Sequence, residues 1–120
     1  LAVDVTDVDD TPGSEKLGTV RLGQGAAVKV MDRSVICHPQ LVETLERLAG
    51  EREVPVQRDI MRGGGTDAGA IHTTRMGVLT GGVSVPCRYI HTPTEMADLG
   101  DAAACVKLLA AFAQEELTRL

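Results

Sequence analysis

The sequence contains almost no aromatic residues and no excess of basic charge. Only 2% of its 120 residues are aromatic, and tryptophan is absent. A chain of this composition lacks the stacking platforms that bind single-stranded nucleic acid or sugar rings. Twelve lysines and arginines are outnumbered by 17 aspartates and glutamates, which gives a net charge of −5. This balance argues against binding to nucleic acid or to an anionic membrane through bulk electrostatics.

Long apolar runs and paired cysteine motifs are also missing. The most apolar stretch, residues 102–113, is interrupted by Lys107 and is too short to span a bilayer. The first ten residues contain four aspartates and no basic residue, which does not fit a signal peptide. Three cysteines without CxxC spacing indicate reduced thiols. We therefore predict a cytoplasmic protein without a membrane-bound segment.

The length and the composition are otherwise typical of one globular domain, which we expect to span residues 1–120. Extended patterns predict strands at residues 1–5, 19–22, 26–31, 54–61 and 78–85. Helical spacing predicts helices from His38-Pro39 to Gly50, over 66–76, and from an Asp101 cap onward. The last helix is expected to bury a face made of Val106, Leu109, Ala110, Ala113 and Leu117. This order favours an α/β fold, with a mixed sheet flanked by helices.

Asp4 is a carboxylate within an otherwise apolar strand. Alternation places Ala2 and Asp4 on one face and Leu1, Val3 and Val5 on the other. A carboxylate on a strand suited to burial must be paired, hydrogen-bonded or bound to a metal. The sequence alone leaves these three roles open. The acids that follow at positions 7, 9 and 10 are most simply interpreted as solvated loop residues.

His91 comes directly after a strand of buried type. In α/β sheets such strand ends carry ligand sites, so His91 is either a ligand or a local hydrogen-bonding residue. The other two histidines, His38 and His72, are interpreted as helix residues. No Cys/His cluster or HExxH motif is present, so spacing predicts no zinc site complete within this chain.

A glycine-rich turn separates a predicted strand from a predicted helix. Gly63, Gly65 and Ala68 satisfy the pattern G-x-G-x-x-A of dinucleotide sites. No acid that could bind a ribose follows between Ala68 and Thr94, and Asp67 would repel a phosphate. The nucleotide interpretation is therefore disfavoured. A tight turn, or a close approach of the backbone to another ligand, remains.

Four segments resemble motifs of the tetrahedral aminopeptidases, in the same order. They are LAVDVT with DTPG (1–13), GQG with KVMDRS (23–34), GGGTDAG (63–69) and PCRYIHTPTE (86–95). These cytoplasmic di-metal peptidases are also labelled glutamyl or deblocking aminopeptidases, and sometimes endoglucanases. The resemblance implies a partial catalytic domain of a di-metal aminopeptidase fold, its C-terminal portion. The upstream half of the site and an inserted β domain are then absent from residues 1–120.

The resemblance also implies roles for particular residues. Asp4 matches a carboxylate ligand of one metal ion, and His91 matches an imidazole ligand of the other. Two divalent ions are implied, of which zinc, cobalt and manganese suit these donors. Glu95 is expected to orient His91 or to fix its loop. Thr66 and Asp67 are expected to lie near the substrate or to cap the helix.

The implied function is that of a metal-dependent aminopeptidase, which removes N-terminal residues from peptides and assembles as a homo-oligomer. The family's general base and its other ligands lie upstream, so no catalytic residue is assigned here and the isolated chain is predicted to be inactive. Two alternatives stay open. One is an endoglucanase-like glycoside hydrolase using Asp4 and Glu95 as its carboxylate pair. The other is a non-catalytic binding or assembly module that needs no metal.

Overall fold

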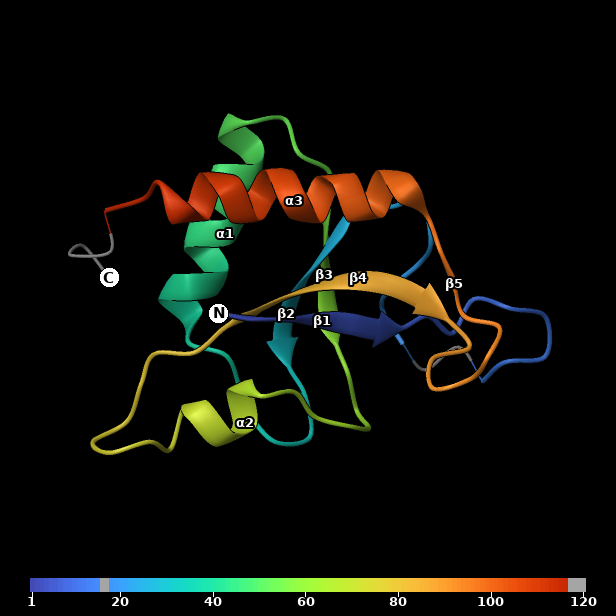
Figure 1. Ribbon diagram of the computed structural model, residues 1–120, viewed down its shortest axis with the longest axis horizontal. Coiled ribbons are helices and arrows are strands. Elements are labelled where there is room, and N and C mark those ends of the chain that lie inside the picture. The colour runs from blue at the N-terminus through green and yellow to red at the C-terminus, as the bar shows by residue number, and fades with distance from the viewer. Residues whose placement is uncertain (16–17, 117–120) are drawn as a thin grey trace.

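A computed structural model describes residues 1–15 and 18–116 (Figure 1). The elements in chain order are β1 (Ala2–Asp7), β2 (Ala26–Met31), α1 (Pro39–Glu51), β3 (Val56–Ile60), α2 (Ala68–Ile71), β4 (Gly82–Arg88), β5 (Met96–Ala97) and α3 (Leu99–Ala113). Within these ranges, no helix combines the length and apolar character needed to cross a bilayer.

The described strands form one mixed sheet in the order β1-β4-β2-β3, with β5 paired to the end of β4. β1 runs parallel to β4 and β2 runs parallel to β3, whereas β2 and β4 are antiparallel. β1 is thus an edge strand of the described sheet. The predicted α/β class, a mixed sheet with flanking helices, is confirmed.

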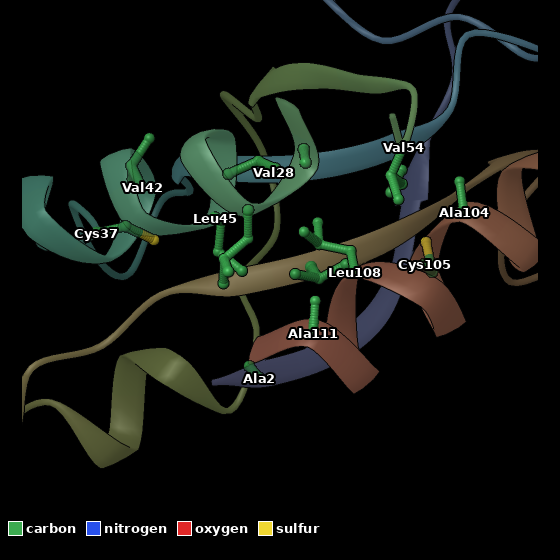
Figure 2. Close-up of a cluster of buried hydrophobic side chains, with 14 of the residues drawn as sticks. Ala2, Val28, Cys37, Val42, Leu45, Val54, Ala104, Cys105, Leu108 and Ala111 are labelled. Carbon is green, nitrogen blue, oxygen red and sulfur yellow. The ribbon is translucent and has the colours of Figure 1, made fainter. Parts of the chain in front are cut away.

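The main core lies between the sheet and the helices α1 and α3. Both helices contact β2, and α3 also contacts β4 and α1. Figure 2 shows Leu45 of α1 and Leu108 of α3 in the same cluster as Val28 of β2. Both leucines are fully buried, and burying a side chain of this size stabilises a fold by about 1.5–3 kcal/mol. These contacts fix one face of the sheet as the apolar face.

The helix predicted from His38-Pro39 onward is confirmed as α1. Pro39 occupies its first turn, where the missing amide hydrogen costs no hydrogen bond. Leu41, Leu45 and Leu48 recur at helical spacing and are all buried.

The start of α3 differs from the prediction, because Asp98 and not Asp101 is the N-cap. The Asp98 side chain accepts hydrogen bonds from the amides of Gly100 and Asp101. Asp101 itself lies inside the helix and is buried. Its two oxygens accept the amide hydrogens of Gly23 and Gly25 at 2.8 and 2.7 Å. Asp101 therefore ties α3 to the turn that precedes β2.

The buried face predicted for α3 is wrong. Val106 is 67% exposed, and Ala110 and Ala113 are exposed as well, whereas Leu109 is half-buried. The buried residues are Asp101, Ala104, Cys105, Leu108 and Ala111. Apolar residues surround most of this helix, so periodicity does not distinguish its faces, and contact with β2, β4 and α1 decides which face is buried. Leu117 lies outside the described residues.

Three further predictions need correction. Residues 19–22 are not a strand: Thr19 Oγ1 donates to the Arg58 carbonyl, and Gln57 accepts the Arg21 amide hydrogen. These side-chain hydrogen bonds replace strand pairing.

The helix expected at 66–76 is reduced to α2, because hydrogen-bonded turns follow Ile71. The strand expected at 78–85 is β4 instead, and it starts where Gly82 pairs with Ala2 of β1. Its last residue, Arg88, pairs with Met96 of β5, so both ends of this strand are set by partners that the local sequence does not specify. β5 lies between β4 and α3, in a segment for which the sequence predicted no strand.

Candidate metal and peptide site

The face of the sheet opposite α1 and α3 carries charged side chains. Val28 packs in the main core, so the next residue along β2, Lys29, points to the opposite face. On the two neighbouring strands, Asp59 of β3 and Gly82 of β4 are in register with Lys29. Asp4 of β1 pairs with Ser84, which shares this face. Carboxylates from β1 and β3 thus lie on the same side of the sheet.

A pocket of about 490 Å³ opens on this side of the molecule. It is lined by β1 and the loop after it, by residues 18–20, by the end of β3 with the glycine-rich turn, and by the loop after β4. Asp4 and His91 both line it. The tertiary structure therefore brings together two candidate ligands that are far apart in sequence.

Asp4 is exposed, and its Oδ1 accepts the Val5 amide hydrogen at 2.8 Å. It is accessible because β1 is an edge strand; Val3 and Val5 are also 59% and 37% exposed. The expectation that β1 is suited to burial along its length is wrong, since only Ala2 and Thr6 of this strand are buried. The carboxylate retains free acceptor positions toward the pocket.

His91 is exposed on a loop with unusual backbone angles. Its φ is +61°, and Tyr89 two residues earlier has a φ of +58°. This left-handed region is uncommon for residues other than glycine, although asparagine, aspartate and histidine adopt it more often than most. Glu95 Oε1 accepts the His91 amide hydrogen at 2.8 Å and so stabilises the loop through its backbone. A role for Glu95 in orienting the imidazole ring stays a prediction.

The two residues expected near the substrate occupy different positions. Thr66 is half-buried and lines the pocket, whereas Asp67 is exposed at the start of α2 and is not part of the pocket lining. Asp67 makes no side-chain capping hydrogen bond. The Thr66 amide and hydroxyl both donate to Asp32 Oδ2 at 3.1 Å. Substrate binding by Thr66 and Asp67 stays a prediction.

The structure adds four charged residues to the pocket lining: Asp7, Asp9, Asp59 and Arg62. Asp59 Oδ2 accepts a hydrogen bond of 2.6 Å from Lys29 Nζ, and both side chains are almost completely buried. A signal for this pair existed in the sequence, because Lys29 interrupts the apolar strand 26–31. A buried ammonium group requires an opposite charge.

A second ion pair holds the loop that follows β1. Arg88 Nε on β4 donates to Asp10 Oδ1 at 2.6 Å. This hydrogen bond lowers the pKa of Asp10 below its usual value, although partial burial opposes the shift. The ionised pair keeps the acidic segment that contains Asp7 and Asp9 beside β4. The sequence predicted solvated acids here, because no local pattern identifies Arg88 as the partner of Asp10.

The pocket supplies some of the donor groups that a metal ion needs. Residues 1–15 and 18–116 contain no group of three or more His, Cys, Asp or Glu side chains placed to hold a metal. Asp4 and His91 are nevertheless the donor types that zinc, cobalt and manganese accept, in a pocket that carries three further aspartates. The residues present therefore fit part of a metal site and not a complete one.

Comparison with known proteins assigns the family. The model of the M42 glutamyl aminopeptidase family matches residues 1–108. The chain therefore belongs to this family of peptidases, as the resemblance implied.

Individual relatives agree in sequence and in structure. A putative aminopeptidase of Acetivibrio thermocellus is 47% identical over 109 residues, which are 91% of this chain and 33% of the relative. The structure of an aminopeptidase from the archaeon Desulfurococcus kamchatkensis matches with a TM-score of 0.90 at 39% identity, covering 95% of this chain and 33% of that one. The TET1 peptidase of Pyrococcus horikoshii matches with a TM-score of 0.73 at 33% identity, over 81% and 28% of the two chains.

The chain spans about a third of the length of the relatives it matches.

Proposed function

We propose that this chain supplies one wall of the active site of a metal-dependent aminopeptidase. In this proposal residues 1–120 are the C-terminal portion of the catalytic domain, and the rest of the protein completes the site. The observation that carries the proposal is that Asp4 and His91, from opposite parts of the chain, line one acidic pocket. Membership in the M42 family supports the same reaction class.

Asp4 and His91 would each hold one of two divalent ions, with zinc, cobalt or manganese as suitable metals. Bound ions of this kind activate a water molecule and polarise the scissile carbonyl. For His91 to act as a ligand its ring must be neutral, and its exposed position on the loop after β4 leaves the ring accessible. The hydrogen bond from the His91 amide to Glu95 fixes the backbone from which the ring projects.

The other lining residues suit a peptide with a free amino terminus. The carboxylates of Asp4 and Asp7 give the pocket negative charge, which attracts a protonated amine, whereas the charge of Asp59 is balanced by Lys29. Thr66 would contact the substrate from the glycine-rich turn, with Asp67 next to it at the start of α2. Among the described lining residues, Arg62 is the only lysine or arginine. No feature of the pocket favours a glycoside substrate, since aromatic residues do not line it.

Assembly into a homo-oligomer is part of the proposal, because the similar TET1 peptidase assembles into a tetrahedron or a large octahedral shell. A cytoplasmic location is also proposed, on the basis of three free and buried cysteine thiols.

The test uses the chain alone and in a chimaera. Alone, it is expected to show no turnover of an aminoacyl-nitroanilide with zinc, cobalt or manganese. The chimaera carries this chain in place of the matching third of the Acetivibrio thermocellus relative. It is expected to hydrolyse the same substrate, and Asp4→Ala or His91→Ala should each reduce kcat/KM at least a hundredfold together with metal content. His72→Ala is the matched control, because this histidine lies outside the pocket.

Four results would contradict the proposal. Turnover by the isolated chain would show that its site is complete. Undiminished activity and metal content in the His91→Ala chimaera would remove the ligand role. Hydrolysis of a cellulose derivative and not of peptides would favour the glycosidase alternative. A chain that binds a protein partner without metal, and tolerates both substitutions, would instead fit the assembly module.

A further inference from the structure

We propose that Asp32 is a positioning residue for peptide binding, which holds Thr66 and the turn 63–66 in place as one wall of the pocket. The inference rests on the proposed aminopeptidase function and assigns a role to a residue that does not itself line the pocket. Asp32 lies directly after β2, and the turn lies after β3. Their contact joins two segments that are separate in the sequence.

Asp32 is 2% exposed and accepts hydrogen bonds at both carboxylate oxygens. Oδ1 accepts from the Ser34 amide at 2.7 Å, the Ser34 hydroxyl at 2.6 Å and the Val35 amide at 3.0 Å. Oδ2 accepts from the amide and the hydroxyl of Thr66, each at 3.1 Å. Oδ1 thus orders the loop that contains Asp32, whereas Oδ2 holds Thr66 in the wall of the pocket.

The charge state of Asp32 is consistent with this role. Burial would raise the pKa of Asp32, but the hydrogen bonds from Ser34, Thr66 and Val35 outweigh burial and lower it. The carboxylate is therefore ionised at neutral pH, and hydrogen bonds to an ionised acceptor are stronger than those between neutral groups.

The backbone of the turn is shaped to meet the same loop. The Arg33 amide donates to the Gly64 carbonyl at 3.1 Å. A Cβ atom at Gly69 would lie 2.2 Å from Ser34 Oγ, and one at Gly65 would lie 2.9 Å from it. Side chains at these two positions would displace Ser34, so glycine is required at 65 in the turn and at 69 in α2 for the loop of Ser34 to pack against them.

Thr66 is the residue through which Asp32 acts on the pocket. Both of its donors are used by Asp32, which leaves the hydroxyl lone pairs as acceptors. A substrate amine or amide hydrogen is the group such an acceptor can bind. Loss of the Asp32 contact would free the turn without removing either Asp4 or His91, so substrate affinity should fall while the metal ligands remain.

The first experiment measures amide hydrogen exchange in this chain. Asp32→Asn keeps one acceptor oxygen for the three donors of Ser34 and Val35, and it places an amide NH2 group opposite the Thr66 backbone amide, which that group cannot accept. Exchange of the Thr66 amide is expected to rise at least tenfold relative to Leu45 in α1. Asp101→Asn is the matched control, since it removes a buried carboxylate that also accepts two backbone amides, from Gly23 and Gly25. In the control, the Thr66 to Leu45 ratio should not change.

If Asp32→Asn does not fold, Thr66→Val tests the contact from the other side. It removes the hydroxyl donor and keeps the backbone, and exchange at position 66 is expected to rise about threefold. An unchanged Thr66 exchange ratio in the variant that folds would overturn the proposal.

The second experiment uses the chimaera with the Acetivibrio thermocellus relative. Asp32→Asn is expected to raise KM about tenfold, with kcat within threefold of the parent and metal content unchanged. Asp101→Asn should leave KM unchanged. A fall in kcat or in bound metal with an unaltered KM would overturn the assigned role. A parent chimaera that binds metal but hydrolyses no peptide would refute the proposed function, while the exchange ratios would still decide whether Asp32 positions the turn.

Discussion

Replacing Asp59 by asparagine should cause a large loss of stability, because it leaves a buried lysine without its counter-charge. Lys29 Nζ lies 2.6 Å from Asp59 Oδ2, and the two side chains are 0% and 3% exposed. β2 lies between β4 and β3 in the sheet, so water cannot easily replace the missing partner. Breaking a buried ion pair on one side costs about 3–5 kcal/mol.

The size of this effect can be judged against the whole fold. A chain of this length has a free energy of unfolding of roughly 6–18 kcal/mol, at 0.05–0.15 kcal/mol per residue. Asp59→Asn would therefore remove a large part of the stability. Lys29→Met combined with Asp59→Leu removes both charges and should recover at least about 2 kcal/mol relative to Asp59→Asn, because desolvation of the pair is avoided.

Urea denaturation followed by circular dichroism measures these free energies. Glu46→Gln is the control: it breaks the Arg58–Glu46 pair, whose side chains are 65% and 29% exposed, and solvent screening should make its effect small. The reasoning is refuted if Asp59→Asn and Glu46→Gln cost the same, or if the double variant is less stable than Asp59→Asn.

The remaining predictions concern acid stability, thiol reactivity and the core. Asp10 and Asp32 have lowered pKa values, so the stability they contribute is present above pH 3.8 and is lost as the pH falls further; unfolding midpoints across pH 2–6 check this. Burial raises the pKa of Cys105 to about 11, so a thiol reagent at pH 8 should label it only after urea is added. Leu45→Ala should cost about 2–5 kcal/mol in urea denaturation.

These three predictions have direct counter-results. The argument on acid stability is contradicted if the unfolding midpoint does not decrease when the pH is lowered from 4 to 2. Rapid labelling of Cys105 in the native protein would contradict the argument on thiol reactivity. A loss of less than about 1 kcal/mol in the free energy of unfolding for Leu45→Ala would contradict the argument on the core.

Local sequence patterns predicted those helices and strands whose pattern is compatible with only one type of secondary structure. Pro39 and the leucine spacing identified α1, and the apolar run 26–31 identified β2. The prediction for α3 located the helix but not its buried face, because apolar residues occur nearly all around it. β4 was displaced because its first residue is set by pairing with Ala2 of β1 and its last by pairing with Met96 of β5.

The candidate site was predicted in part. Asp4, His91 and Thr66 were selected from the sequence with the help of the family resemblance, and all three line the pocket. Asp59 was missed because its significance depends on the neighbouring strand, where Lys29 lies. Asp32 was missed because its contact with Thr66 crosses from one loop to another.

The sequence by itself determined the residue chemistry: a carboxylate on the first strand, an imidazole after a later strand, and a glycine-rich turn between a strand and a helix. Those properties follow from local patterning and from residue type. The tertiary structure decided which of these groups share one pocket, which charges are buried together, and which face of α3 meets the sheet. Such outcomes depend on strand order and register, and the order β1-β4-β2-β3 cannot be derived from the local pattern of any one segment.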